Sequence, residues 1–374
     1  MPTTDADTAP AIPPGIRRNH WMNQVRVHAS MRPDATAFRY LGATTTWADA
    51  HRRITAIAAG LARRGVGFGD RVLLLTLNSP EVVEAVLAVN TLGAMAVPIN
   101  IRLAPAEMAY IVDDADGAVL LVDAPLLPLA DAIRQITGRL ERVVVLGSPE
   151  APDGAHALAD LVAEPLDGFE APDVPESTPA LIMYTSGTTG RPKGAMLDHV
   201  NLFSQAVTCI RVMEMVDESD ISFLTAPLFH IAGLGSIAPN VALGIPTVIH
   251  PLGAFNAAET VDAWERERAT VVFNVPTQWQ AICAEPGVRD RDLALRVISW
   301  GAAPASEELL IAMAETFPDA MNVAVFGQTE MSPITCALRG DYSIRKLGSV
   351  GRPIPTMEYR VVDDDMVDVT RGEV

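Results

Sequence analysis

Short, continuous runs of aliphatic and β-branched residues recur along most of this chain and alternate with helical patterns. Runs of this kind, without a polar residue at every second position, are typical of parallel strands buried on both faces of a sheet. The alternation limits the chain to an α/β fold in which layered sheets are flanked by helices. The number of runs indicates more than one sheet. The predicted strands are Asp70–Leu77, Ala96–Asn100, Gly117–Asp123, Arg142–Gly147, Ala180–Thr185, Pro246–Pro251, Thr270–Pro276 and Arg296–Gly301.

Capping signals mark where several of the intervening helices begin. Ser79, followed by Pro80 and Glu81, combines an N-cap side chain with a proline at the first helical position and an early acidic residue. These three features together predict a helix after the strand Asp70–Leu77. Further N-cap candidates are Thr46, Asp198 and Ser306.

Changes in composition divide the chain. Residues 1–18 are rich in Pro and Ala and have no apolar core, so they are expected to be a disordered leader and not a signal peptide. Residues 19–335 are the predicted α/β body, with two sheet subdomains and a Pro- and acid-rich connection near 148–178. Residues 336–374 are expected to begin a small β-barrel-like subdomain, with a strand at 358–363 followed by a turn.

Charge and cysteine content exclude several classes of protein. The formal charge of −18, from 28 basic and 46 acidic residues, excludes nucleic acid as the main partner, because phosphate backbones need a net basic face. Cys209, Cys283 and Cys336 match no metal-ligand spacing, so reduced thiols in a cytoplasmic protein are expected. The most apolar stretch, Val82–Ile99, is interrupted by polar residues, glycines and a proline, and predicts no transmembrane helix.

One loop carries most of the chemical information. The sequence Tyr184–Gly194 (YTSGTTGRPKG) follows an apolar strand and precedes a helix that begins near Asp198. Its glycines let backbone N–H groups approach an anion, its hydroxyls add donors, and Lys193 adds a mobile positive charge. The spacing is not that of a Walker loop. A flexible polar surface loop is the alternative, but the order of these residues favours a phosphate-binding loop.

This string resembles the signature of the adenylate-forming superfamily, which contains acyl-CoA synthetases, luciferases and the adenylation domains of peptide synthetases. The resemblance covers the chain from about residue 20 to its end, because further motifs of the superfamily follow in the same order. It is closest in type to fatty acyl-CoA synthetases. The further motifs are Pro227–Gly233, Gly301–Pro304, Phe326–Glu330, Gly348–Pro353 and Gly372–Val374.

The resemblance implies a site for ATP and Mg²⁺, with coenzyme A as the second substrate. Glu330, and Thr185 directly or through water, are the implied Mg²⁺ ligands, in agreement with the few protein carboxylates that Mg²⁺ takes beside substrate phosphates. The implied catalytic residues are Lys193, His230, Thr329 and Glu330. The implied nucleotide-binding residues are Thr185, Ser186, Gly187, Thr188, Thr189, Gly190, Lys193, Gly301, Ala302, Ala303, Pro304, Phe326, Gly327, Gln328 and Thr329.

Each motif also has a purely structural interpretation. His230 lies between two apolar residues and is either a packed core histidine or, by resemblance, the group that orients the acid. Gly301–Pro304 is either an ordinary strand-to-helix turn or the loop that borders the adenine. Glu330 is either a solvated carboxylate or the metal ligand. Spacing alone does not separate these alternatives.

The acid substrate is predicted from the residues expected around it. The segment Val272–Trp279 has no acidic residue, which argues against an amino acid, since its amino group would need a counter-charge. An apolar tunnel favours a fatty acid; aryl or other carboxylic acids remain an alternative, and a non-catalytic nucleotide- or acyl-binding module is another. The alternative for Trp279 and Trp300 is that they are ordinary core residues. The predicted acyl-pocket residues are Phe229, His230, Ile231, Val275, Pro276, Trp279 and Trp300.

The sequence departs from the superfamily pattern at two places. Ala324 and Val325 stand where many relatives have Gln-Gly, and Phe326 replaces a more common tyrosine, which keeps adenine stacking but removes a hydroxyl. The Thr-Gly-Asp motif and the C-terminal lid with its catalytic lysine do not follow, so the chain is expected to be the N-terminal part of a longer ligase and severely impaired alone. Superfamily members often form dimers, and at most peripheral membrane contact is expected, because no basic amphipathic helix is present.

Overall fold

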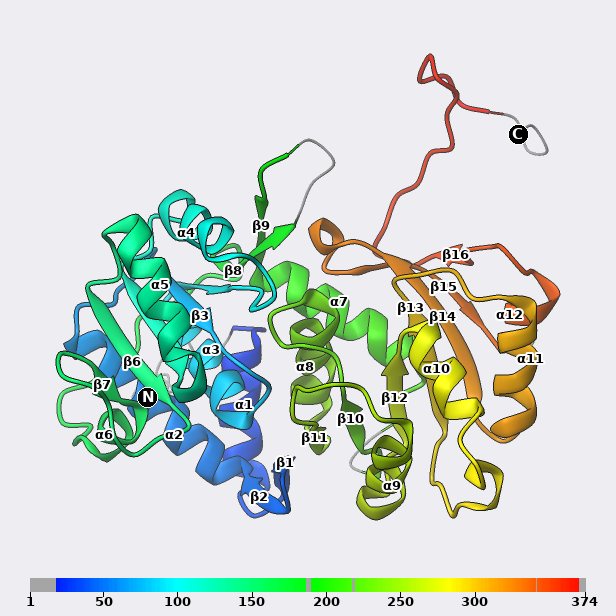
Figure 1. Cartoon of the computed structure of the whole chain (residues 1–374), viewed down its shortest axis with the longest axis horizontal. Helices are drawn as coiled ribbons and strands as arrows, with labels where there is room; N and C mark the ends of the chain where they lie inside the picture. The colour runs from blue at the N-terminus through cyan, green and yellow to red at the C-terminus, as the bar shows by residue number, and fades with distance from the viewer. Residues whose placement is uncertain (1–17, 186–189, 217–218, 341, 370–374) are drawn as a thin grey trace, which may run out of the picture.

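A computed structural model describes residues 18–369 of the chain, except 186–189, 217–218 and 341. Within these residues, the strands form two sheets that lie side by side in the molecule (Figure 1). The predicted α/β class is confirmed. The predicted leader falls almost wholly outside the described residues, and so do Ser186, Gly187, Thr188 and Thr189 of the predicted phosphate-binding loop.

The first sheet has seven strands in the order β7-β6-β5-β3-β4-β8-β9. All neighbours are parallel except β8 and β9, which form an antiparallel hairpin at one edge. The strands are β3 (Arg71–Leu75), β4 (Met95–Pro98), β5 (Val119–Asp123), β6 (Arg142–Leu146), β7 (His156–Ala157), β8 (Pro179–Thr185) and β9 (Lys193–Asp198).

The second sheet has nine strands in the order β16-β15-β14-β13-β12-β10-β11-β1-β2. Its centre is parallel, and antiparallel pairs close both ends. The N-terminal hairpin joins this sheet through the parallel pairing of β1 with β11. The strands are β1 (Thr36–Tyr40), β2 (Ala43–Thr46), β10 (Ser222–Leu224), β11 (Thr247–Ile249), β12 (Val271–Asn274), β13 (Val297–Gly301), β14 (Met321–Gly327), β15 (Ile334–Arg339) and β16 (Arg352–Pro353).

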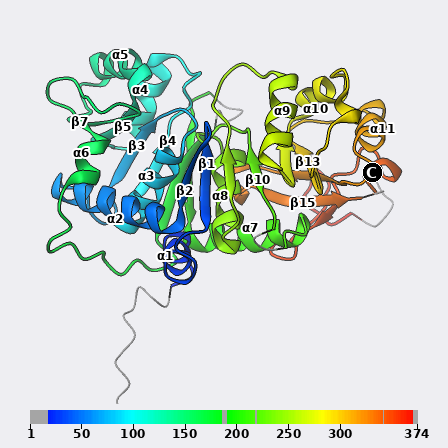
Figure 2. The ribbon, with the colours of Figure 1, turned by 90° about the horizontal axis from the view of Figure 1, so that it is seen from below.

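Helices cover the sheets in layers (Figure 2). Each predicted N-cap is confirmed, since the side chains of Thr46, Ser79, Asp198 and Ser306 accept hydrogen bonds from the first turns of α2, α3, α7 and α11. No helix in the described part of the chain is long and apolar enough to cross a membrane. The helices are α1 (Trp21–Met31), α2 (Trp47–Arg63), α3 (Pro80–Thr91), α4 (Pro105–Asp114), α5 (Leu127–Thr137), α6 (Leu158–Ala163), α7 (His199–Val212), α8 (Ile231–Leu243), α9 (Ala257–Glu267), α10 (Pro276–Cys283), α11 (Glu307–Thr316) and α12 (Tyr342–Arg345).

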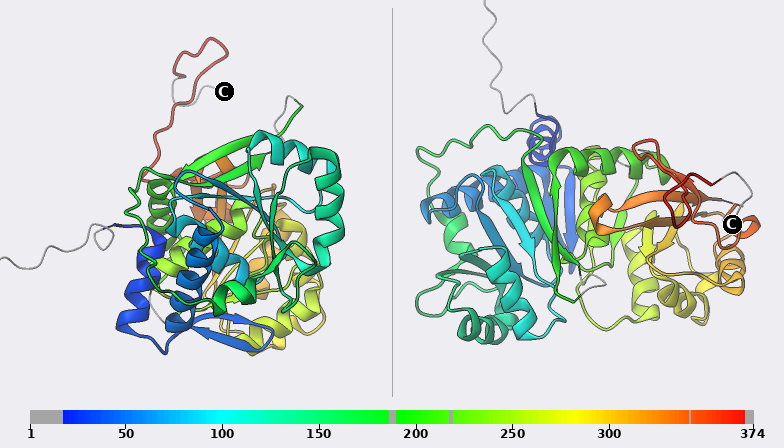
Figure 3. Two further views of the ribbon diagram at one scale, coloured as in Figure 1. Left: turned by 90° about the vertical axis from the view of Figure 1, so that its left-hand side faces the viewer. Right: turned by 90° about the horizontal axis from the view of Figure 1, so that it is seen from above.

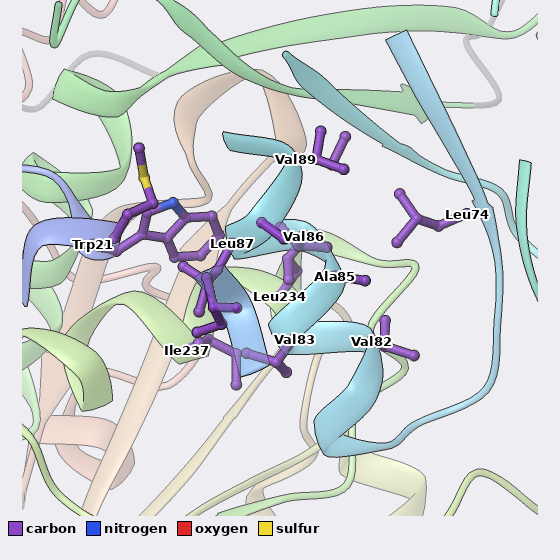
Figure 4. Close-up of a cluster of buried hydrophobic side chains, with 14 of the residues drawn as sticks. Trp21, Leu74, Val82, Val83, Ala85, Val86, Leu87, Val89, Leu234 and Ile237 are labelled. Carbon is purple, nitrogen blue, oxygen red and sulfur yellow. The ribbon is translucent and has the colours of Figure 1, made fainter. Parts of the chain in front are cut away.

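Helix α3 is buried on nearly all sides and joins the two halves of the molecule. Figure 4 shows Val82 and Val89 of α3 on the side toward Leu74 of β3, whereas Val83 and Leu87 lie beside helix α8. One apolar cluster therefore runs from the seven-stranded sheet through α3 to α8. Close packing of this cluster fixes the separation of the two sheets, because protein interiors have few voids and low compressibility.

All eight strands predicted from apolar runs are present, within a few residues at each end. The boundary between residues 335 and 336 falls inside β15, which continues the nine-stranded sheet and does not begin a separate unit. The predicted strand at 358–363 is wrong. In the described part of the chain this segment forms no strand, and its one β-bridge joins Val362 to Asp368 across a turn. This end of the chain leaves the body as an extended segment (Figure 3). The connection near 148–178 carries β7 and α6 and lies between two strands of one sheet.

A buried histidine at the start of α7 makes the fold sensitive to acid. His199 is 1% exposed, and neither of its ring nitrogens has a hydrogen-bond partner among the described residues. The ring centroid of His20 lies 5.3 Å from that of His199. Burial and the nearby His20 lower the pKa of His199 to about 3, so the folded protein holds this side chain neutral.

We expect stability to fall on acidification because of His199. Its pKa is about 3 when folded and 6.5 when unfolded, so below pH 6.5 the unfolded state takes up a proton that the folded state does not. For this group the loss between pH 7 and pH 5 is about 2 kcal/mol of the free energy of unfolding. Urea unfolding at both pH values should show a smaller pH dependence for His199→Leu than for the wild type.

Comparing variants separates the contribution of His199 from those of carboxyl groups that change the stability in the opposite direction with pH. Burial raises the pKa of Glu84 to about 7 and that of Asp123 to about 6, so both carboxyls favour folding at low pH and lose that contribution as pH rises. They are unchanged in the variant. The exposed His156 provides a control as His156→Leu, which keeps the wild-type pH dependence. An equal pH dependence in His199→Leu and the wild type would refute the assignment.

Candidate nucleotide and acid site

A cavity of about 600 Å³ opens between the two halves of the molecule. Its wall is formed by the end of β8, helices α7 and α8, strands β12 and β14, and the turn after β14, which Figure 1 places around the junction of the two sheets. No lysine or arginine side chain among the described residues borders it. The predicted site residues on the wall are Thr185, Gly190, Phe229, His230, Ile231, Ala302, Phe326, Gly327, Gln328, Thr329 and Glu330.

Two predicted metal ligands from distant segments meet at this cavity. The hydroxyl Oγ1 of Thr185, at the end of β8, donates to Oε1 of Glu330 at 3.3 Å. Glu330 belongs to the 3₁₀ turn Thr329–Met331 that follows β14. No group of three or more acidic, histidine or cysteine side chains fit to hold a metal is present in the described parts of the chain. The pair therefore suits a hard cation that completes its shell with phosphate oxygens and water.

Glycines let the backbone close up at the carboxyl ends of β13 and β14. A Cβ atom on Gly327 would lie 1.7 Å from the carbonyl oxygen of Pro333, and one on Gly301 would lie 2.4 Å from that of Val325. Ala302, which follows Gly301, has a φ of 65° and lies in the left-handed region. These contacts hold the two neighbouring motifs against each other at the cavity wall.

His230 is held as a neutral hydrogen-bonding group. It is the N-cap of α8, and its Nδ1 accepts from the backbone N–H of Ala232 at 3.2 Å. The imidazole borders the cavity and is open to water there, but the surrounding protein lowers its pKa from 6.5. In the neutral ring an accepting Nδ1 leaves the proton on Nε2, which can donate to a ligand in the cavity.

A buried asparagine that sequence reasoning missed ties the His230 loop to the other sheet. Asn78, 1% exposed, lies after β3, and its Oδ1 accepts from the backbone N–H of Leu228 at 2.9 Å. Its Nδ2 donates to the carbonyl oxygens of Ala226 and His250 at 3.0 and 3.3 Å. The Asn-Ser-Pro order after a strand was a visible signal, but it was interpreted only as a helix start.

Comparison with known proteins identifies the family. The sequence profile of the AMP-binding enzymes matches residues 25–374. The chain belongs to this family. It is 36% identical over 354 residues to a feruloyl-CoA synthase of Amycolatopsis sp, covering 92% of this chain and 66% of that protein. An indoleacetate–CoA ligase of Aromatoleum aromaticum is 33% identical over 356 residues, covering 95% and 68%.

Further relatives extend the range of substrates. A long-chain-fatty-acid–CoA ligase of Thermus thermophilus is 32% identical over 337 residues, covering 86% of this chain and 60% of that protein. Among solved structures, an anthranilate–CoA ligase in complex with anthranoyl-AMP matches with a TM-score of 0.87 at 30% identity, covering 95% of this chain and 68% of that chain. This AMP-binding chain thus spans about two thirds of the length of these relatives.

The remaining predicted nucleotide-binding residues that the structure describes lie outside the cavity wall. Lys193, the first residue of β9, is exposed and does not border the cavity formed by the described residues. Gly301, Ala303 and Pro304 flank Ala302, which is the member of that motif that borders the cavity. The loop that precedes Lys193 falls in the range 186–189, which the structure does not describe.

Part of the predicted acyl pocket is corrected. Trp279 is fully buried, its Nε1 donates to the carbonyl oxygen of Ser299, and its ring packs against Trp264 and Phe317. The Nε1–H of Trp300 donates to Oδ1 of Asn322, and the ring packs against the same apolar cluster as Trp279. Both are core residues and do not border the cavity. Val275 and Pro276, the first residues of α10, are also absent from its wall.

Strand alternation explains this correction. Neighbouring residues of a strand point to opposite faces of a sheet. In β12 and β13 the even-numbered Val272, Ile298 and Trp300 pack with the core under α9–α11, whereas Phe273 faces the cavity. Val325 of β14, Cys209 of α7 and Met213, which follows α7, complete that apolar wall. Both faces of these strands are largely apolar, so the sequence alone does not tell which of their residues face the cavity.

We expect Gly327→Ala to disrupt the site. The added methyl group has to displace the backbone at Pro333, which destabilises the protein by about 1–3 kcal/mol and moves Glu330 away from Thr185. Calorimetry should show weaker binding of a non-hydrolysable acyl-adenylate analogue, by about tenfold or more, together with a lower Tm. Gly253→Ala is the matched control, because a Cβ there meets no atom within 4 Å. Unchanged binding in Gly327→Ala would contradict the assignment.

Proposed function

We propose that this chain is the adenylate-forming part of an acid–coenzyme A ligase that activates an aryl-substituted carboxylic acid. The observation that carries the proposal is the meeting of Thr185 and Glu330 at a cavity that is also lined by apolar side chains. A cation-binding pair beside an apolar pocket suits a reaction that joins a nucleotide phosphate to an organic acid. Membership of the AMP-binding family supports the nucleotide half of this proposal.

The nucleotide half of the site needs a cation. The protein carries a formal charge of −18, and no basic side chain among the described residues borders the cavity. Mg²⁺ held by Glu330 and Thr185 would neutralise phosphate charge and polarise the α-phosphate. Phe326 would stack on the adenine, while Thr329 and Gln328 would donate to the phosphates and sugar. Lys193, exposed on β9, would follow the departing pyrophosphate.

The acid half of the site orients the attacking carboxylate. The Nε2–H of neutral His230 would donate to one carboxylate oxygen, while the other attacks the α-phosphorus of ATP and displaces pyrophosphate. The thiolate sulfur of coenzyme A then attacks the acyl carbon and displaces AMP. Adenylation is necessary because an oxide is a poor leaving group from a carboxylate, whereas AMP is a good one. Each step conserves charge and atoms.

Two observations favour an aryl acid over a fatty acid. Trp279 and Trp300, the expected walls of a tunnel, do not border the cavity formed by the described residues, and this cavity of about 600 Å³ would hold both the reacting part of the nucleotide and the acid. Feruloyl-CoA synthase and indoleacetate–CoA ligase, the relatives at 36% and 33% identity, are both named for aryl acids. A compact ring fits these constraints better than a long chain.

A fatty acid is the second candidate. The Thermus thermophilus relative is named a long-chain-fatty-acid–CoA ligase, and a void of about 60 Å³ lies behind the cavity wall at Cys209, Met213 and Phe273. Movement of those side chains would lengthen the pocket. The void as it stands is much smaller than the main cavity, so this candidate requires a rearrangement that the aryl acid does not.

Calorimetry with non-hydrolysable acyl-adenylate analogues separates these candidates. We expect cinnamoyl- and benzoyl-type analogues to bind in the presence of Mg²⁺ at least about tenfold more tightly than analogues with octanoyl or longer chains. Binding that strengthens steadily with alkyl length would support the fatty acid. Equal binding of all analogues and of AMP alone would show that the cavity does not recognise the acid, and would reject an acid-specific site.

We expect Glu330→Gln to abolish the contribution of Mg²⁺ to ATP binding. The amide keeps the size of the side chain but removes the charge that holds the cation. The affinity for ATP, measured by calorimetry with and without Mg²⁺, should differ clearly in the wild type and be nearly equal in the variant. Glu315→Gln, at an exposed position on α11, is the control and should retain the Mg²⁺ effect. A retained effect in Glu330→Gln would remove Glu330 from the metal site.

A further inference from the structure

Gln205 places a polar amide in the apolar wall of the cavity. It lies on α7, one turn before Cys209, and is 3% exposed. The same cavity is also lined by apolar residues that include Met213, just after α7, Gly235 on α8 and Ile334 on β15. A primary amide can donate two hydrogen bonds and accept two. Its burial here therefore calls for partners.

The protein supplies only a weak partner for this amide. Nε2 of Gln205 donates to Sγ of Cys209 at 3.1 Å, and Oε1 accepts from no group in the described part of the chain. Sulfur is a poor acceptor and a thiol a poor donor, so either orientation of the amide leaves a polar atom without a strong partner. Burial raises the pKa of Cys209 to about 12, so its thiol stays neutral and offers no charge-assisted bond. Because the side chain of Gln205 borders the cavity, a molecule bound there can hydrogen-bond to the amide.

A ligand in the cavity can satisfy Gln205. We propose that the substrate acid carries a hydroxyl group on its ring and that this hydroxyl hydrogen-bonds to the amide of Gln205. A hydroxyl both donates and accepts, so it fits either orientation of the amide. The inference rests on the proposed aryl-acid ligase function and makes Gln205 the residue that selects hydroxylated rings.

The position of Gln205 agrees with such a role. Thr185 and Glu330, which serve the reacting end of the acid, come from β8 and the turn after β14, whereas Gln205 comes from the α7 wall. Ser236, on the neighbouring helix α8, also borders the cavity and donates its own proton to the carbonyl oxygen of Ala232 at 2.6 Å. Its hydroxyl oxygen is thus left as a second acceptor on the same wall.

The test compares pairs of acyl-adenylate analogues that differ by one hydroxyl. Cinnamoyl-sulfamoyl adenosine and its 2-, 3- and 4-hydroxy derivatives are titrated into the wild type and into Gln205→Leu. We expect at least one hydroxylated analogue to bind wild type about tenfold more tightly than the parent compound. In Gln205→Leu this preference should vanish, while the unsubstituted analogue binds as well or better and AMP binding is unchanged.

Two further variants keep the test decisive. Val207→Ala changes an exposed residue on the outer face of α7 and should keep the wild-type preference, which shows that the helix tolerates substitution. If Gln205→Leu proves unstable, Gln205→Asn is used in its place. This variant keeps an amide and should retain part of the preference for hydroxylated analogues. No preference for any hydroxylated analogue in the wild type, or the same preference in Gln205→Leu, would overturn the inference and leave the aryl-acid proposal intact. Binding of alkyl analogues alone would overturn both.

Discussion

The apolar cluster that runs from the seven-stranded sheet through helix α3 to α8 connects the two halves of this molecule. The cavity is a space between two sheets, so its width depends on what holds the sheets apart. Val83 and Leu87 of α3 fill that gap on one side, and the Asn78 side chain crosses it with three hydrogen bonds. Large apolar groups and a satisfied buried amide give one low-energy distance. The width of the cavity therefore depends on this packing between the two halves.

The chemistry that the cavity can support depends on the polar side chains on its wall. Two carboxylates, two threonine hydroxyls, a neutral imidazole and several amides and hydroxyls lie on the wall among apolar side chains. In such a low-dielectric setting each of these groups interacts more strongly with a bound charge than it would in water. An acidic protein can therefore bind anions if a cation is held beside them, and Thr185 and Glu330 are the pair that we propose for that cation.

Local features of this fold could be predicted from the sequence, and relations between distant segments could not. The β-branched runs and the N-caps at Thr46, Ser79, Asp198 and Ser306 depend on neighbours within a few residues, and all are present. β9 was missed because its residues are mostly exposed and few are apolar. Trp279 was wrongly predicted because a tryptophan looks the same in a core as in a pocket wall, and the packing of α10 with α9 and α11 is not visible in the local sequence. The bond between Thr185 and Glu330 spans 145 positions, and motif resemblance, not spacing, brought the two together.

The N-terminal hairpin has a consequence for how the chain is made. Strands β1 and β2 leave the ribosome first, yet β1 pairs with β11, where Phe38 lies opposite Thr247. The nine-stranded sheet therefore cannot close around β1 until the chain has been synthesised beyond β11. Such long-range pairing slows folding and leaves a strand edge open meanwhile. During translation, the β1–β2 hairpin has to stay soluble with one edge of β1 open until β11 emerges.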